Sequence, residues 1–221
     1  MVSQALEDYL KMIYKLEELN AEAQLEKGVS TSSIAERLGI SQASVSNMLK
    51  KLSDKDLIEY APYYGVTLTS QGRKIALQML RRHRVLELYL VERLGYQWDE
   101  VDAEAEVLEH AVSDRLVNRM WEELGRPTQD PHGSPIPDQD GNMEVQTMVS
   151  LCEAASGAHC QIVRIQNRTP EELRYLFSIG LVKGAQVKVF EKAPFEGPLS
   201  VEVKGEQLAL DFRLAQSIFV A

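Results

Sequence analysis

The stretch EAEVLEHAVSD, residues 104–114, concentrates side chains that bind metal ions. Glu106, Glu109 and His110 stand at positions i, i+3 and i+4, so a helix through them would carry all three on one face. Neighbouring carboxylates repel each other and destabilise a helix unless a positive charge lies between them. These residues therefore fit two interpretations, a solvated acidic face or one half of a metal site that another segment completes.

Charge is unevenly distributed along the 221 residues, whose formal net charge is −9. Between positions 85 and 145 there are fifteen acidic residues and only four arginines. The preceding segment instead carries basic pairs, namely Lys50-Lys51, Arg73-Lys74 and Arg81-Arg82. The asymmetry predicts one module that binds a polyanion and another that binds cations.

Composition excludes several classes of protein. No apolar run of about 18 residues is present, so no membrane span is predicted, and the N-terminus lacks the pattern of a signal peptide. Cys152 and Cys160 alone do not make a disulfide framework or a zinc ribbon. We expect a cytoplasmic protein with two ordinary thiols.

The elements that must position the acidic stretch begin with helices. Apolar residues at helical spacing predict a helix from about 3 to 21. A short helix over 31–38 should end at Gly39, and Ser41 should cap a longer helix that runs to about 55. Residues 57–72 alternate like two strands around a turn near Gly65. The pattern is that of a winged helix-turn-helix.

The helix that begins at Ser41 carries small hydroxyls, amides and lysines. These side chains reach bases and phosphates, so they favour DNA binding over a purely structural three-helix unit. The candidates for base reading are Asn47, Gln42 and Ser44, and those for phosphates are Lys50, Lys51 and the wing residue Tyr64. The same segment also carries Ser41, Ala43 and Ser46, which complete the predicted DNA-binding set.

The remaining chain predicts a helical module and a β module. A long helix should run from Ser70 to about Gly95, and a second from about 99 to 124 with a possible break near Ser113. Their surplus of apolar positions favours a homodimer. The stretch GRPTQDPHGSPIPDQDGNM is interpreted as a linker. Five short strands and one helix, about 169–179, then predict a small β-barrel.

This order of modules resembles the diphtheria toxin repressor family of metal-dependent transcriptional regulators. The strongest segments are EDYLKMIYKLEE, SIAERLGISQASVSNMLKKL, RRHRVLELYL and AEAEVLEHAVSD. The resemblance implies a mainly α winged helix-turn-helix (residues 1–71), an α-helical metal-binding and dimerisation domain (72–137), a linker (138–150) and a small SH3-like β-barrel (151–221). That barrel is shared with ferrous-iron transport accessory proteins. The implied partners are a second copy of the chain and double-stranded operator DNA with an inverted repeat.

The resemblance also implies two metal sites. The family's primary site falls on Asp8, Glu106, Glu109 and His110. Its ancillary site falls on His83, Glu87 and Asp102, with Glu172 as the match in the barrel. Iron-dependent members have methionine and cysteine where this chain has Asp8 and Glu106, whereas manganese-responsive members have acids at both positions.

Carboxylate and imidazole ligands suit a harder cation than sulfur ligands do, so Mn²⁺ is expected first and Fe²⁺ second, and other divalent transition metals could substitute. Short manganese regulators have a glutamate where this chain has Lys11, and a charged lysine cannot be a ligand. Their two-metal arrangement is therefore not carried over. Repression of metal-uptake genes is the function that the family implies.

Alternatives remain for several residues. His83, between two arginines, fits a surface histidine as well as a ligand, and His132 and His159 are interpreted as structural. An enzyme is disfavoured because Glu106-Val-Leu-Glu109-His110 lacks the first histidine of the H-x-x-E-H metalloprotease pattern, and no nucleophile has a visible base. A winged-helix regulator that responds to an organic effector is the nearer alternative.

Overall fold

The computed structural model describes residues 3–22, 25, 28–61, 64–144, 147–166 and 169–221. The chain divides into two compact units, one of residues 1–82 with 137–142 and one of residues 83–136 with 143–221. The division falls within the long helix α4, Ser70–Leu94. Within the described ranges, no helix combines the length and apolar character needed to cross a lipid bilayer.

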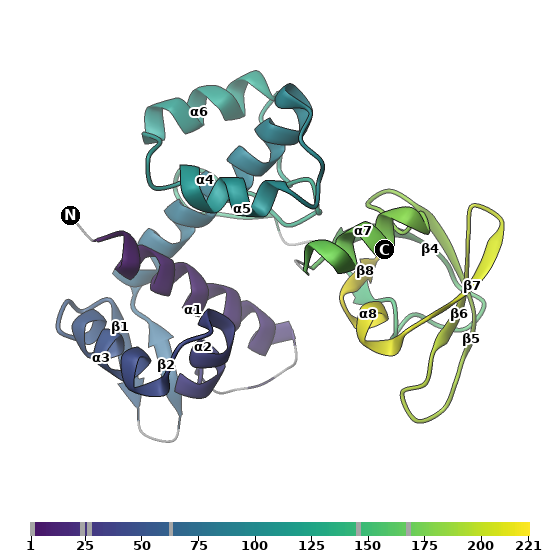
Figure 1. The fold of residues 1–221 in the computed structure, drawn as a ribbon, viewed down its shortest axis with the longest axis horizontal. Helices are drawn as coiled ribbons and strands as arrows, with labels where there is room; N and C mark the ends of the chain where they lie inside the picture. Colours follow the sequence, from purple (N-terminus) through teal and green to yellow (C-terminus); the bar gives the residue numbers. More distant parts are fainter. Residues whose placement is uncertain (1–2, 23–24, 26–27, 62–63, 145–146, 167–168) are drawn as a thin grey trace. The chain divides into compact units, whose positions relative to one another are not determined.

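The first unit is built from three helices, a hairpin and the first part of α4 (Figure 1). Its elements are α1 (Gln4–Glu22), α2 (Thr31–Leu38), α3 (Gln42–Ser53), β1 (Ile58–Ala61) and β2 (Gly65–Leu68). Helix α1 forms because Leu6, Leu10 and Ile13 recur at helical spacing, and all three are buried. The predicted winged helix-turn-helix is confirmed.

Local capping determines the two short helices. The Ser30 side chain accepts the backbone N–H of Ser33 at 3.0 Å and begins α2, and Ser41 accepts the N–H of Ser44 at 3.2 Å and begins α3. Between them Gly39 has φ +64°, a left-handed conformation that glycine adopts without a steric penalty. Sequence signals therefore set the turn that orients α3.

The wing is an antiparallel pair in which Tyr60 lies opposite Val66. Its predicted turn includes Pro62 and Tyr63, which lie outside the described residues. Glu17 of α1 ties the wing to α4, because one carboxylate oxygen accepts the N–H of Leu68 at 2.9 Å and the other lies 2.5 Å from Arg73. The hairpin is thus fixed to the helices behind it.

The helical part of the second unit contains the rest of α4 with α5 (Val101–Leu108) and α6 (Asp114–Glu123). The single helix predicted over 99–124 is therefore two helices, and the predicted break is wider than a kink near Ser113. Glu109 is the C-cap of α5, and the chain turns until Ser113 accepts the N–H of Leu116 at 3.3 Å to begin α6. As a result, Glu106, Glu109 and His110 do not share one continuous helix.

The proline-rich stretch after α6 is irregular, as predicted, but part of it is buried rather than an exposed linker. Asp130, His132 and Ser134 are all among the buried residues. The Asp130 carboxylate holds this loop in shape by accepting the backbone N–H groups of His132 and Ser134, each at 2.8 Å. Residues 145 and 146, within the predicted linker 138–150, lie outside the described residues.

The C-terminal part of the second unit is a six-stranded antiparallel sheet in the order β3-β8-β4-β5-β6-β7 (Figure 1). Its elements are β3 (Val149–Ser150), β4 (His159–Ile165), α7 (Pro170–Ser178), β5 (Gln186–Lys192), β6 (Leu199–Val203), β7 (Glu206–Leu210), α8 (Phe212–Gln216) and β8 (Ile218–Val220). The five predicted strands and the predicted helix are present, and β3 and α8 were not predicted. The fold class predicted from the sequence is confirmed.

Candidate metal centre

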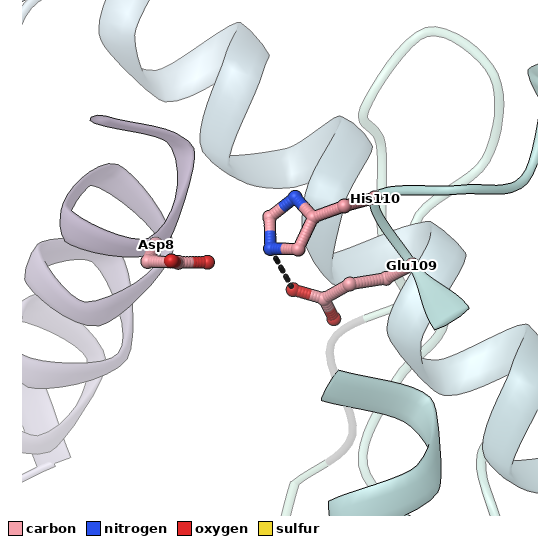
Figure 2. Close-up of side chains that lie close together, drawn as sticks. All are labelled: Asp8, Glu109 and His110. Carbon is pink, nitrogen blue, oxygen red and sulfur yellow. Dashed lines mark ion pairs between the residues drawn. The ribbon is translucent and has the colours of Figure 1, made fainter. Parts of the chain in front are cut away.

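Glu109 and His110 lie together where α5 ends. The Nε2 atom of His110 is 3.6 Å from Oε1 of Glu109, and Figure 2 shows this pair with its contact dashed. Glu109 is fully buried, whereas His110 is partly accessible. Figure 2 also labels Asp8, which belongs to α1 in the first unit. A buried carboxylate beside an imidazole is a donor set that suits a divalent cation.

His83 of α4 approaches the same carboxylate from the other side. Its Nδ1 atom lies 2.7 Å from Oε2 of Glu109, so the ring donates a hydrogen bond there. This contact directs the other ring nitrogen, Nε2, toward two further carboxylates, with Oδ1 of Asp102 at 3.3 Å and Oε1 of Glu87 at 3.4 Å. A histidine held in this way by a carboxylate is the usual arrangement around a metal ligand.

The side chain of His83 is almost completely buried, so the surface-histidine interpretation is wrong. Burial of the ring lowers the pKa of His83, but the carboxylates around it, foremost Glu87, outweigh this effect and raise the pKa to about 10. The imidazolium is therefore the positive charge that balances this cluster when only protein groups are present. A divalent cation would serve the same electrostatic purpose.

A second histidine, which the sequence alone predicts to be structural, adjoins this cluster. His132 is 1% exposed, and its Nε2 atom lies 3.8 Å from Oε1 of Glu87. The proline-rich composition of its loop concealed this burial. The signal that was available is the DPHGS pattern, in which an aspartate can bond to backbone N–H groups two and four residues later and fold the loop around the histidine.

A buried nitrogen tests whether a metal ion fits these residues. Within the described part of the chain, Nε2 of His83 makes no hydrogen bond, although carboxylate oxygens of Asp102 and Glu87 lie 3.3 and 3.4 Å away. Buried polar atoms are nearly always satisfied, so this nitrogen calls for an explanation. Ligand atoms about 2.1 Å from one ion stand roughly 3 Å apart. The contacts of 3.3 to 3.8 Å around Glu87 and His83 are slightly wider than that and fit an ion.

The structure brings together most of the predicted ligands within the second unit. His83, Asp102 and Glu106 each offer a ligand atom within 4.8 Å of the others, and Glu87 and Glu109 adjoin them through His83. Glu172 is different, because it lies in the first turn of α7 and accepts the N–H of Thr169 at 3.2 Å in a capping box. Its role as a ligand stays a prediction.

The residues predicted to contact DNA are exposed on α3 and the wing. They are Ser41, Gln42, Ala43, Ser44, Ser46, Asn47, Lys50, Lys51 and Tyr64. Three of the hydroxyls also have local partners, since Ser41 and Ser44 share a 2.9 Å contact and Ser46 donates to the carbonyl of Gln42. The amide of Asn47 and the two lysines are consequently the stronger candidates for DNA contact.

Three family descriptions cover the chain in succession. Residues 1–66 match the iron dependent repressor N-terminal DNA binding domain, and residues 69–138 match the iron dependent repressor metal binding and dimerisation domain. Residues 149–221 match the FeoA domain. The iron-dependent repressor IdeR of Mycobacterium tuberculosis is 31% identical over 97% of this chain and 95% of its own length. The chain belongs to the iron-dependent repressor family.

Manganese-dependent regulators and repressors are also similar to this chain, in sequence and in structure. The transcriptional regulator MntR of Bacillus subtilis is 34% identical over 54% of this chain and 80% of its own length. A solved structure described as a manganese-dependent transcriptional repressor complex with manganese has a TM-score of 0.87 and 40% identity, covering 98% of this chain and 99% of that one. This protein is a metal-dependent, DNA-binding transcriptional repressor with a C-terminal SH3-like domain.

Proposed function

We propose that this repressor is activated by Mn²⁺ and controls metal-uptake genes in the cytoplasm. Fe²⁺ is the second candidate, and other divalent transition metals could substitute. The observation that carries this proposal is the buried cluster of carboxylates and imidazoles around His83, which contains only oxygen and nitrogen donors. Both cysteines lie in the C-terminal part, at 152 and 160, and neither belongs to the cluster. Such a donor set favours Mn²⁺ over softer metals.

The ligands are assigned to two sites. The primary site consists of Glu109 and His110 of the second unit, with Asp8 of the DNA-binding domain and Glu106 as its other ligands. The Glu106 carboxylate lies 3.8 Å from Nδ1 of His83, so in the structure it adjoins the ancillary ligands. The ancillary site consists of His83, Glu87 and Asp102, to which we add His132. Glu172 is retained as the ligand that the resemblance implies for the SH3-like domain. No catalytic role is proposed for either site, because the family consists of transcriptional regulators.

The metal ion supplies positive charge where carboxylates converge. Without that charge, Asp8 and Glu109 repel each other, so α1 is only loosely held to the metal-binding domain and the two DNA-reading heads of a dimer sample many separations. The ion acts as an effector only if it binds the DNA-competent arrangement more tightly. A preference of about 100-fold would supply roughly 2.7 kcal/mol of coupling between metal and DNA.

A homodimer is supported by apolar side chains that the helical part leaves exposed. Val107 of α5 is 71% exposed and Leu116 of α6 is 45% exposed, and both lie within the domain whose family description names dimerisation. A symmetric dimer would place its two α3 helices in successive major grooves of an inverted repeat, one helical turn or a multiple of it apart.

Replacing Lys50 tests the assignment of roles on α3. We expect Lys50→Ala to weaken binding to all DNA sequences by a similar factor, and to reduce the slope of log affinity against log salt by about one unit, because one phosphate contact is lost. Fluorescence anisotropy across a salt series measures both quantities. Lys204→Ala, an exposed lysine of the SH3-like domain, is the matched control. A sequence-selective loss would instead make Lys50 a base-reading residue.

The experiment that tests the proposed function is a metal titration. DNA selected from a random library in the presence of Mn²⁺ is titrated with protein that has been stripped of metal, with and without Mn²⁺ or Fe²⁺. Tighter DNA binding with Mn²⁺ is expected. The same affinity with and without either metal would favour the alternative of an organic effector.

A further inference from the structure

The side chain of Trp98 joins the ancillary site to the SH3-like domain. Trp98 lies in the turn between α4 and α5, and its ring centroid is 5.2 Å from that of His132 and 6.2 Å from that of Phe177. His132 belongs to the buried loop, and Phe177 belongs to α7. Three segments that are distant in sequence therefore meet on one indole ring.

The loop that carries His132 also lies directly against strand β4. The backbone N–H of Ile165 donates to the carbonyl of His132 at 2.8 Å. The next residue, Gly133, has φ +92°, and a Cβ atom there would lie 2.1 Å from the carbonyl oxygen of Val163. Only glycine allows this approach, so the backbone of the loop is seated on the SH3-like domain without an intervening side chain.

Polar contacts also join the SH3-like domain to the Trp98 turn and to the His132 loop. Arg174 of α7 lies 2.9 Å from the carboxylate of Asp99, next to Trp98, and that carboxylate is only 9% exposed. Lys183 donates to the carbonyl of Asp130 at 3.2 Å, and burial of its ammonium group lowers the pKa of Lys183. The SH3-like domain therefore holds both the Trp98 turn and the His132 loop.

On its other side His132 faces the ancillary site, with Nε2 at 3.8 Å from Oε1 of Glu87. We propose that the SH3-like domain acts on the ancillary site through Trp98, which holds His132 against Glu87. Trp98 and Phe177 are positioning residues. The inference rests on the proposed function, because it concerns metal binding at a site assigned above.

The physical reason is preorganisation. A histidine on an untethered loop must lose side-chain and backbone freedom when it binds an ion, and this loss weakens the binding. The ring contacts of Trp98 and the backbone contacts of β4 impose that order before the ion arrives. Removing the contacts of Trp98 should therefore weaken the ancillary site and leave the primary site unchanged.

The test is Mn²⁺ binding to the full chain, measured by calorimetry and by the electron paramagnetic resonance signal of free Mn²⁺. We expect Trp98→Leu and Phe177→Ala to weaken the ancillary class of sites by about 10-fold, the lower range for residues that support metal ligands. Tyr175→Ala, a half-exposed aromatic on the same helix, is the matched control and should bind Mn²⁺ as the wild type does. Since Phe177 is 59% exposed, its variant keeps the test valid if Trp98→Leu does not fold.

A double-mutant cycle separates positioning from a general loss of stability. If Trp98 acts through His132, the ancillary affinity of the double variant Trp98→Leu/His132→Ala should equal that of His132→Ala alone. Additive losses would overturn the inference, as would wild-type ancillary affinity in both Trp98→Leu and Phe177→Ala. A wild-type protein that binds no Mn²⁺ would instead refute the proposed function itself.

Fluorescence gives an independent readout, because the chain has two tryptophans and Trp121→Phe leaves Trp98 alone. In that variant we expect the fluorescence emission of Trp98 to change as Mn²⁺ binds at the ancillary site. This change should disappear when His132 is also replaced by alanine. If calorimetry shows that Mn²⁺ binds at both the primary and the ancillary site but the Trp98 emission does not change, the placement of Trp98 beside the ancillary site is contradicted.

Discussion

Replacing Asp8 by alanine is expected to leave a folded dimer whose DNA affinity no longer responds to Mn²⁺. In the proposed mechanism Asp8 is the one ligand supplied by the DNA-binding domain, whereas Glu109 and His110 come from the metal-binding domain. Without Asp8 the ion can still bind to the other ligands, but it has no bond to the helix that it must hold. The proposed coupling of about 100-fold, roughly 2.7 kcal/mol, should fall to nearly nothing.

DNA binding measured against Mn²⁺ concentration, for the wild type and Asp8→Ala, gives this coupling directly. Glu18→Ala changes another carboxylate of α1 and is the matched control, whose metal response should be retained. An undiminished response in Asp8→Ala would show that the ion does not link the two domains through this residue.

The largest effect on metal binding is expected from Glu109→Gln. The Glu109 carboxylate is fully buried, accepts the hydrogen bond of His83 at 2.7 Å and lies 3.6 Å from Nε2 of His110. An amide of the same size removes the negative charge and leaves only one acceptor oxygen for the two imidazoles of His83 and His110, so the hydrogen bond that orients His83 is weakened. The variant should lose a ligand of the primary site and the support of an ancillary ligand at the same time.

We expect the primary Mn²⁺ affinity of Glu109→Gln to fall by about 100-fold or more, because a ligand is lost, and the ancillary affinity by about 10-fold, within the range known for residues that support metal ligands. Calorimetry measures both, and circular dichroism checks the fold. Glu100→Gln, an exposed carboxylate just before α5, should bind Mn²⁺ normally. Wild-type Mn²⁺ affinity in Glu109→Gln would exclude this carboxylate from both sites.

The DNA-reading half of the fold was predictable because its signals are local. Ser41 and Gly39 act through contacts within a few residues, and the structure shows both the cap and the left-handed turn. The end of α5 was not predictable in this way. Residues 104–112 contain no glycine or proline, yet the helix stops at Leu108, where Glu109 meets the His83 side chain from a distant part of α4. No local stop signal marks that boundary, which coincides with the long-range contact between Glu109 and His83.

The ancillary cluster shows the same division between local and long-range information. His83 and Glu87 are four residues apart on one helix, so their proximity could be predicted from spacing. The approach of His132 to Glu87 could not, because it depends on a loop folded by Asp130 and seated on β4. Composition identified that loop as irregular, but it carries no information on burial.

The most direct test of Mn²⁺ activation is the DNA affinity of the metal-free and Mn²⁺-loaded wild-type protein, measured on the same selected inverted-repeat DNA at one salt concentration. The mechanism predicts that Mn²⁺ tightens binding by about 100-fold, and that the same DNA tightens Mn²⁺ binding by an equal factor, as linkage requires. Equal DNA affinities with and without Mn²⁺, in a protein that demonstrably binds the ion, would contradict it.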